Sequence, residues 1–222
     1  MRITAAIIGL LAAGTAHADI DNMRDYFVGA GFGAQSGSEA WTVRHGGHDG
    51  SLLGSAGSYF AGPYQHGTPI FGPLLGIGDY AGWWHGATFE GLFIHAGPGI
   101  SLHAQRNFSE ATTLSGLTVQ AEMVLNGSAS NGMDVDVFTI IDGVRTHRGG
   151  FTFFHTTVAT EQAFDFGGEV QFGAGDRVEV VYSDNGSFLY DHGNTNVILN
   201  VVPAPASCAL LGIGFLGRRR RR

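Results

Sequence analysis

The chain contains no lysine and one cysteine, and both shortages exclude classes of function. All twelve Lys and Arg positions are arginine, so lysine-based phosphate loops, Schiff-base chemistry and serine mechanisms with a lysine base are excluded. The single cysteine, Cys208, lies close to the C-terminus, which leaves the central region without a disulfide or a thiol nucleophile. We therefore expect the central region to be stabilised by packing.

Basic residues are also scarce in the central part of the chain. Six of the twelve arginines are Arg2 and residues 218–222, so the region between them is more acidic than the whole-chain net charge of −7 suggests. An acidic surface repels phosphate backbones, and we therefore expect no nucleic-acid partner.

The first eighteen residues have the three parts of a secretion signal. Arg2 precedes an apolar run over residues 3–13, and Ala16-His17-Ala18 supplies a small-x-small cleavage site. A buried N-terminal helix is the alternative for this run. We expect export through the Sec machinery, removal of residues 1–18, and a mature chain that begins at Asp19.

The C-terminus combines a proline motif, an apolar segment over residues 206–217 and five arginines in that order. The flanking residues are Val202, Pro203, Ala204 and Pro205 on one side and Arg218, Arg219, Arg220, Arg221 and Arg222 on the other. Because positive charge collects on the cytoplasmic side of a membrane, this order predicts an inserted helix with the arginines in the cytoplasm. The domain boundaries are thus 1–18, 19–201 and 202–222.

These C-terminal residues resemble the PEP-CTERM sorting signal of Gram-negative and planctomycete bacteria, with Ala204 in place of the usual glutamate. The resemblance implies an exosortase as partner, which cuts near the proline motif and releases the body or passes it to the cell surface. The apolar segment is short, since its length makes about 18 Å of helix against a hydrocarbon core of roughly 30 Å. Membrane contact is expected only through this helix, before processing, with local thinning of the bilayer.

Residues 19–201 are expected to form one all-β domain. Apolar and polar residues alternate at 117–123 and 134–140, and β-rich runs follow at 151–158, 161–166, 176–183 and 196–202. Shorter strand-like pieces lie at 41–45, 58–61 and 83–84 in a glycine-rich first third, and no helical period of comparable length appears. The sequence therefore predicts a jelly-roll-like β-sandwich between a signal peptide and a sorting helix.

The body also resembles, in its pattern, β-sandwich ectodomains of planctomycete proteins with this type of tail and jelly-roll modules related to carbohydrate-binding domains. The residues that carry this resemblance are 37–43, 92–99 and 172–181, together with Asp191. The resemblance implies a fold, and no function follows from the fold alone.

Trp83 and Trp84 are the leading candidates for ligand binding. Adjacent strand residues point to opposite faces, so one indole is expected inside and the other at the surface, where an aromatic face suits a sugar ring. Tyr80 would extend this platform. The alternative is that both rings only pack against neighbours.

Acidic and amide side chains in turns are candidates for calcium binding, and no other cofactor is expected. Asp184, Asn185 and Asp191 carry the oxygen ligands that this ion prefers, although such residues also simply cap turns. His45 and His48 form one close pair, but no second pair follows at ligand spacing. The other histidines considered are scattered: His85, His95, His103, His147, His155 and His192.

No catalytic signature stands out. The motifs Gly-x-Ser-x-Gly and His-Glu-x-x-His are absent, and the sequence brings no two of its carboxylates together. The carboxylates considered are Glu90, Glu110, Glu122, Asp134 and Asp136. The sequence favours a non-enzymatic, exported cell-surface or matrix protein with a structural or glycan-contacting role. A glycan-active hydrolase or lyase with paired carboxylates on the same scaffold is the alternative.

The export hypothesis predicts a defined N-terminus. When the full chain is expressed in a host with a Sec pathway, N-terminal sequencing of the exported protein should begin at Asp19. Ala18→Arg should block cleavage because the position before the cut requires a small residue, whereas His17→Ser should be processed normally. Export of the Ala18→Arg protein with an unchanged Asp19 terminus would contradict the assignment.

Overall fold

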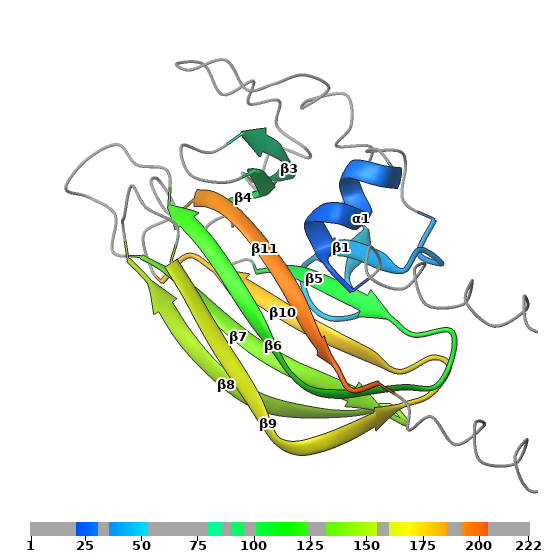
Figure 1. Ribbon diagram of the computed structural model, residues 1–222. Coiled ribbons are helices and arrows are strands. Elements are labelled where there is room, and N and C mark those ends of the chain that lie inside the picture. Colours follow the sequence, from blue (N-terminus) through cyan, green and yellow to red (C-terminus); the bar gives the residue numbers. More distant parts are fainter. Residues whose placement is uncertain are drawn as a thin grey trace, which may run out of the picture.

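The computed structural model describes residues 21–30, 36–52, 80–85, 90–95, 101–123, 132–154, 160–185 and 192–203. These residues form two antiparallel sheets that face each other, so the expected all-β sandwich is confirmed (Figure 1). The elements are α1 (Met23–Ala30), β1 (Trp41–His45), β2 (Ser51–Leu52), β3 (Tyr80–His85), β4 (Glu90–His95), β5 (Leu102–Asn107), β6 (Thr112–Met123), β7 (Met133–Ile141), β8 (Val144–Phe153), β9 (Thr160–Phe172), β10 (Arg177–Ser183) and β11 (His192–Val201).

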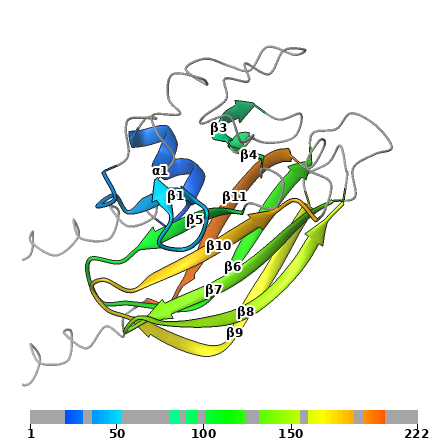
Figure 2. The ribbon, with the colours of Figure 1, turned by 180° about the vertical axis from the view of Figure 1, so that it is seen from behind.

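The two sheets differ in strand order. One has six strands in the order β2-β1-β5-β10-β7-β8, and the other has five in the order β3-β4-β11-β6-β9. Figure 2 shows the six-stranded sheet from its outer side, with β10 between β5 and β7. Strands β8 and β9 follow one another in the chain but belong to different sheets. Arg148 on β8 links them, because its Nη1 donates to the carbonyl oxygen of Phe166 on β9 at 3.4 Å.

The core lies between the sheets and is formed largely by alternate residues of the strands whose side chains the structure describes. On β7 the buried Val135 and Val137 alternate with the half-buried Asp134 and Asp136, which confirms the predicted alternation. The largest fully buried side chains include Trp41, Tyr182, Phe153 and Phe172. The hydroxyl groups of Tyr182 on β10 and Thr195 on β11 are 2.9 Å apart, so a polar contact also joins the two sheets across this core.

The short helix α1 packs against strands of both sheets, β11 and β4 in one and β1 in the other. Asn22 caps it, since its Oδ1 accepts from the backbone N–H of Asp25 at 3.3 Å. Met23 is fully buried, and the buried guanidinium of Arg106 pairs with Asp21 at 3.7 Å. The sequence did not predict this helix, because its eight residues carry too little periodicity to be recognised.

Two turns at one end of the sandwich are tied together by a single carboxylate. The β7–β8 hairpin turns through Asp142 and Gly143, both with positive φ (51° and 78°), as an Asp-Gly type I′ turn requires. The Oδ1 of Asp176 accepts from the backbone N–H of Asp142 at 2.9 Å, and its Oδ2 accepts from that of Gly173 at 2.6 Å. Asp176 therefore holds the β9–β10 turn against the β7–β8 turn.

Other predictions differ from the structure or fall outside it. Strand β5 was not predicted, and β8 begins at Val144, so the strand expected at 151–158 coincides with only its last residues in the described part of the chain. The signal peptide, the strand-like piece at 58–61 and the apolar tail at 206–217 lie outside the described residues. Within the described residues, no helix is long and apolar enough to cross a membrane.

Gly116 on β6 marks a position where the backbone of β9 comes close. A Cβ atom there would overlap the carbonyl oxygen of Phe164, at the irregular pairing between β6 and β9. Gly116→Ala should destabilise the fold by about 1–3 kcal/mol, because a backbone cannot move aside as a flexible side chain can. That cost lowers the Tm by roughly 2–12 °C for a chain of this size.

The matched control is Gly173→Ala, since a Cβ at Gly173 meets its nearest atom, Asp176 Oδ2, at an ordinary contact distance of 3.5 Å. Thermal unfolding should show little change for this variant. Equal melting temperatures for the two variants would contradict the close approach at Gly116.

Candidate functional site

The outer side of the six-stranded sheet carries a connected set of polar and charged side chains, here called the polar face. On β10, Val178, Val180 and Tyr182 belong to the core, which places Glu179 on the opposite side of the sheet. The polar face includes Arg44 (β1), Ser101, His103 and Gln105 (β5 and the residue before it), Glu179 (β10), Asp134, Asp136 and Phe138 (β7), and Arg145, His147 and Thr152 (β8).

Glu179 lies at the centre of this face and is fully buried. Its Oε1 accepts from His103 Nδ1 at 2.8 Å and from Gln105 Nε2 at 3.0 Å, and its Oε2 accepts from Arg145 Nε at 2.8 Å. Burial opposes ionisation of this carboxyl, but the hydrogen bonds from these three residues outweigh it and lower the pKa of Glu179 to about 2. The face is therefore built around a buried carboxylate that stays charged at neutral pH.

The loop between β1 and β2 folds toward this carboxylate. Gln105 Nε2 also donates to the carbonyl oxygen of His48 at 2.6 Å, while Gln105 Oε1 accepts from Arg44 Nε at 3.0 Å. Asp49 accepts from Arg177 Nη2 at 3.0 Å and pairs with His48 at 2.9 Å. The Gly46-Gly47 backbone with positive φ allows this turn, so the histidine-glycine stretch serves to place a loop over the sheet.

Stacked side chains of β7 and β8 extend the polar face toward the β8 edge of the sheet. The guanidinium carbon of Arg145 lies 3.2 Å from the ring centroid of Phe138, whose other neighbour is the imidazole of His147 at 4.9 Å between centroids. His147 Nε2 lies 2.9 Å from Asp136 Oδ1. Arg145 thus packs on the ring of Phe138 while its Nε donates to Glu179.

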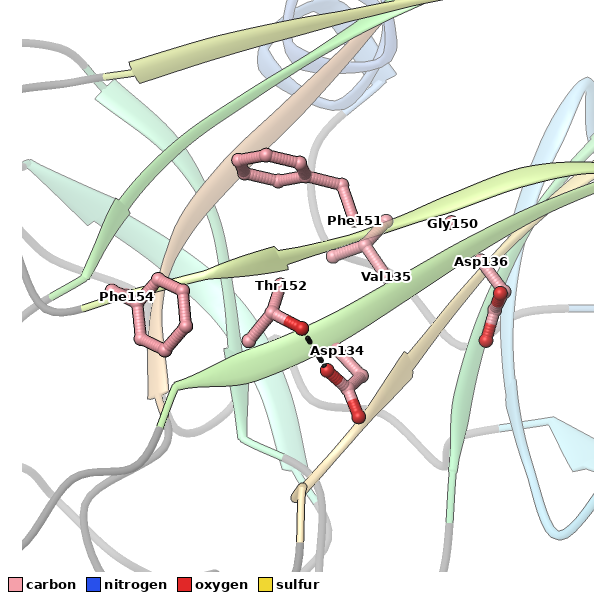
Figure 3. Close-up of a pocket in the computed structure, with 7 residues that line it drawn as sticks. All are labelled: Asp134, Val135, Asp136, Gly150, Phe151, Thr152 and Phe154. Atoms are coloured by element: carbon pink, nitrogen blue, oxygen red, sulfur yellow. Dashed lines mark hydrogen bonds between the residues drawn. The ribbon is translucent and has the colours of Figure 1, made fainter.

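A recess of about 510 Å³ opens at the end of this face, beside β7 and β8. It is lined by Asp134, Val135, Asp136, Gly150, Phe151, Thr152 and Phe154. Figure 3 shows the carboxyl groups of Asp134 and Asp136 on the same side of β7, with Thr152 Oγ1 donating to Asp134 Oδ1 at 2.5 Å. Two of the carboxylates that the sequence alone could not place are therefore neighbours in one recess.

Two aromatic rings accompany these carboxylates. Phe154 is 66% exposed and lies beside Thr152, whereas Phe151 is 43% exposed and projects from the opposite side of β8 (Figure 3). Phe151 packs edge-on against the buried Phe153 at 4.9 Å between ring centroids. Phe154 is thus the ring that stands in the open next to hydrogen-bonding groups.

The aromatic residues predicted to bind ligand lie elsewhere. Tyr80, Trp83 and Trp84 belong to β3, the edge strand of the five-stranded sheet, and so to the other sheet from the recess. Their side chains are outside what the structure describes. A binding role for them stays a prediction.

The predicted calcium ligands are only partly described. Asp184 and Asn185 follow β10, and Asn185 has a positive φ of 42°, while Asp191 lies outside the described residues. No group of three or more His, Cys, Asp or Glu side chains that could hold a metal ion occurs in the described part of the chain. Calcium binding by these three residues stays a prediction.

The sorting motif begins where the sandwich ends. The backbone N–H of Val202 donates to the carbonyl oxygen of Thr113 at 2.8 Å, so Val202 is still tied to the domain, and Pro203 is the last residue described. Ala204, Pro205 and Arg218, Arg219, Arg220, Arg221 and Arg222 lie outside the described residues.

The residues at the centre of the polar face were not predicted from the sequence. Ser101, His103 and Gln105 occupy every second position and Glu179 lies between core valines, which are signals of one strand face. By sequence spacing His103 belongs to the scattered histidines, because its partner Glu179 is 76 positions away in the chain. Only the pairing of β5 with β10 brings the two together.

Comparisons with known proteins give distant matches only among solved structures, since no protein-family model and no curated protein matches the chain. The chain is similar to the C-terminal domain of a chitobiase from Bacteroides fragilis at 13% identity and a TM-score of 0.33, over 46% of this chain and 66% of that one. It is similar to the GH26-CBM35 β-(1,4)-mannanase of Podospora anserina at 13% identity and a TM-score of 0.34, over 59% of this chain and 29% of that one. It is similar to a mutant family 29 carbohydrate-binding module at 13% identity and a TM-score of 0.30, over 57% of this chain and 81% of that one. The chain thus spans less than two thirds of the first two structures.

The buried carboxylate of Glu179 makes the free energy of unfolding depend on pH. Because the pKa of Glu179 is depressed in the folded state to about 2 from an ordinary 4.5, its contribution is present above about pH 4.5 and is lost as the pH falls toward 2. The loss should be on the order of 3 kcal/mol. Urea unfolding at pH 5.5 and pH 2.5 measures it.

The Glu179→Gln variant should have a lower free energy of unfolding than the wild type at pH 5.5. Between pH 5.5 and pH 2.5 its free energy of unfolding should fall by less than that of the wild type. Glu161→Gln is the control, because Glu161 is exposed on the other sheet. Equal acid losses in the wild type and Glu179→Gln would show that the carboxylate does not stabilise the fold in this way.

Proposed function

We propose that this chain is an exported β-sandwich protein of the cell surface or extracellular matrix that contacts polysaccharide through the recess on its polar face. The observation that carries the proposal is the combination in one recess of an exposed ring, Phe154, with two carboxylates, Asp134 and Asp136. An aromatic face accepts the C–H surface of a sugar, and carboxylate oxygens accept hydrogen bonds from its hydroxyl groups.

The shape and charge of the site favour a neutral or basic glycan. A recess of about 510 Å³ is of the size of ordinary ligand sites. The two carboxylates and the acidic character of the chain, with net charge −7, would repel a polyanionic polymer. We therefore expect polymers without uronic acid or sulfate groups to bind best.

The alternative of a hydrolase or lyase with paired carboxylates has one observation in its favour, since Asp134 and Asp136 share the recess. Such an enzyme needs one carboxyl group to donate a proton. Here Asp134 accepts from Thr152, and Asp136 lies 2.9 Å from a nitrogen of the His147 imidazole. Asp134 thus accepts a hydrogen bond from Thr152 and Asp136 is paired with His147, and this engagement of both carboxyl groups by neighbouring side chains favours binding over this form of catalysis.

The terminal segments support the location. The first eighteen residues have the composition of a secretion signal, and the proline motif, apolar segment and arginine cluster resemble an exosortase sorting signal. Val202 is hydrogen-bonded to β6, so a cut after the proline motif would leave every strand of the sandwich in place. The processed body would then reach the surface as a folded domain.

A glycan array and a polysaccharide pull-down with the purified protein test the contact, with calcium and with chelator. Phe154→Ala should weaken binding by about tenfold or more, because losing a stacked Phe side chain removes roughly 1.5–3 kcal/mol of burial. Val144→Ala is the matched control, since Val144 lies on the same strand as the recess residues and is 65% exposed. It should bind like the wild type.

Variants at β3 distinguish the two candidate sites. If Trp83→Ala or Trp84→Ala abolishes binding while Phe154→Ala binds normally, the glycan site lies on β3 and the recess assignment is wrong. Absence of binding by the wild-type protein under every condition would instead favour a purely structural surface protein.

A further inference from the structure

Three side chains of the polar face form a hydrogen-bonded line. Ser101 Oγ is 2.7 Å from His103 Nε2, and His103 Nδ1 is 2.8 Å from Glu179 Oε1. The imidazole of His103 thus lies between the hydroxyl of Ser101 and the carboxylate of Glu179. One ring nitrogen contacts the hydroxyl and the other contacts the carboxylate. This is the order in which a serine nucleophile, its base and an orienting acid are arranged in acyl-transfer enzymes.

The donor and acceptor roles along this line follow from the carboxylate. Glu179 is ionised, because burial of its carboxyl is outweighed by three hydrogen bonds that lower its pKa to about 2, so its oxygens only accept. His103 Nδ1 must therefore carry the hydrogen toward Glu179. In the neutral imidazole this leaves Nε2 as an acceptor, and the Ser101 hydroxyl donates to it. The tautomer is the one that a general base for Ser101 requires.

Burial increases along the line from the hydroxyl to the carboxylate. Ser101 is half-buried, the side chain of His103 is 5% exposed and that of Glu179 is fully buried. Gln105 and Arg145 hold the carboxylate from two sides, so its orientation does not depend on His103 alone. Among the described residues of this line the hydroxyl end is therefore the more exposed one, the end at which a substrate would bind, and the charged end is screened from water.

We propose that Ser101 is the nucleophile of a carboxylic-ester hydrolase site, with His103 as general base and Glu179 as the residue that positions it. Ser101 Oγ bonds to the ester carbonyl carbon as its proton passes to His103 Nε2. The bond from that carbon to the alcohol oxygen breaks, and the alcohol leaves with the proton. Water then adds to the acyl-serine, Nε2 takes a proton from it, and the carboxylic acid departs as Ser101 regains its proton.

The position of Ser101 relative to the recess indicates the substrate class, a step that rests on the proposed glycan contact. Thr152, Asp134 and Ser183 lie opposite one another on β8, β7 and β10. The next strand across is β5, where Leu102 pairs with Tyr182 and Ser101 precedes it. Because β10 lies between β7 and β5, Asp134 and Ser101 are two strand spacings apart, about 10 Å. A glycan held in the recess would thus extend toward Ser101. The substrates of the esterase site would therefore be O-acyl esters carried by that glycan.

Chemical labelling tests the nucleophile without any glycan. The purified full-length protein is treated with a fluorophosphonate probe, and intact mass followed by peptide mapping should show one adduct, at Ser101. With p-nitrophenyl acetate, Ser101→Ala should lower kcat by at least about 100-fold, the usual contribution of such a base–nucleophile pair. Ser183→Ala is the matched control, a serine on the same side of the neighbouring strand, and should keep both labelling and rate.

The role of Glu179 is tested by a measurement that does not change when the protein is merely less stable. Glu179→Gln, compared with the wild type at a temperature where both are folded by circular dichroism, should lower kcat while leaving KM nearly unchanged, because it acts through His103. A wild-type protein without adduct at Ser101, and with the same ester turnover as Ser101→Ala, overturns the proposal and leaves the line as a structural hydrogen-bond chain.

Acetate release from an O-acetylated polysaccharide separates this proposal from the glycan contact. Loss of release in Ser101→Ala with unchanged binding to the deacetylated polymer supports both. Adduct formation at Ser101 in a protein that binds no glycan supports the esterase site and overturns only the glycan contact. The result would add a catalytic role to a chain that its sequence predicts to be non-enzymatic.

Discussion

A carboxylate that has lost its hydration must be compensated by hydrogen bonds or it destabilises the fold, and Glu179 imposes this requirement on the six-stranded sheet. Its donors come from β5, on one side of β10, and from β8, beyond β7 on the other. The β1–β2 loop reaches the same network through Gln105. A single polar network therefore connects side chains from β1 to β8, in addition to the backbone pairing that sets the order β1-β5-β10-β7-β8.

The two sides of this sheet serve different purposes. Its inner side contributes Trp41, Val180 and Tyr182 to a core that stabilises the sandwich by apolar burial. Its outer side holds charged groups whose positions are set by neighbours on other strands and by the ring of Phe138. A rigid sheet of this kind suits a binding face, because the side chains are ordered before a ligand arrives and little conformational entropy is lost on binding.

Local pattern and long-range pairing contributed differently to what could be predicted. The alternation at 134–137 correctly predicted β7 and which of its faces is buried, because a period of two is a property of the strand alone. Beyond it the pattern fails, since Phe138 lies on the polar face and Thr139 is buried. Strand β5 was missed because its apolar–polar alternation covers only Leu102 to Gln105 before Arg106 breaks it, which is too short to stand out. The helix α1 is held by contacts with both sheets rather than by its own periodicity.

The sequence by itself determined the all-β class, the acidic and lysine-free chemistry, and the order of terminal segments, because these depend on composition and on neighbours in the chain. Only the tertiary structure decided which polar residues act together. Ser101 and His103 are two residues apart, but Glu179 joins them from 76 positions beyond His103, and Thr152 meets Asp134 across a hairpin. Such contacts depend on sheet order and register, and a shift of one residue in the pairing would turn each of these side chains to the other face.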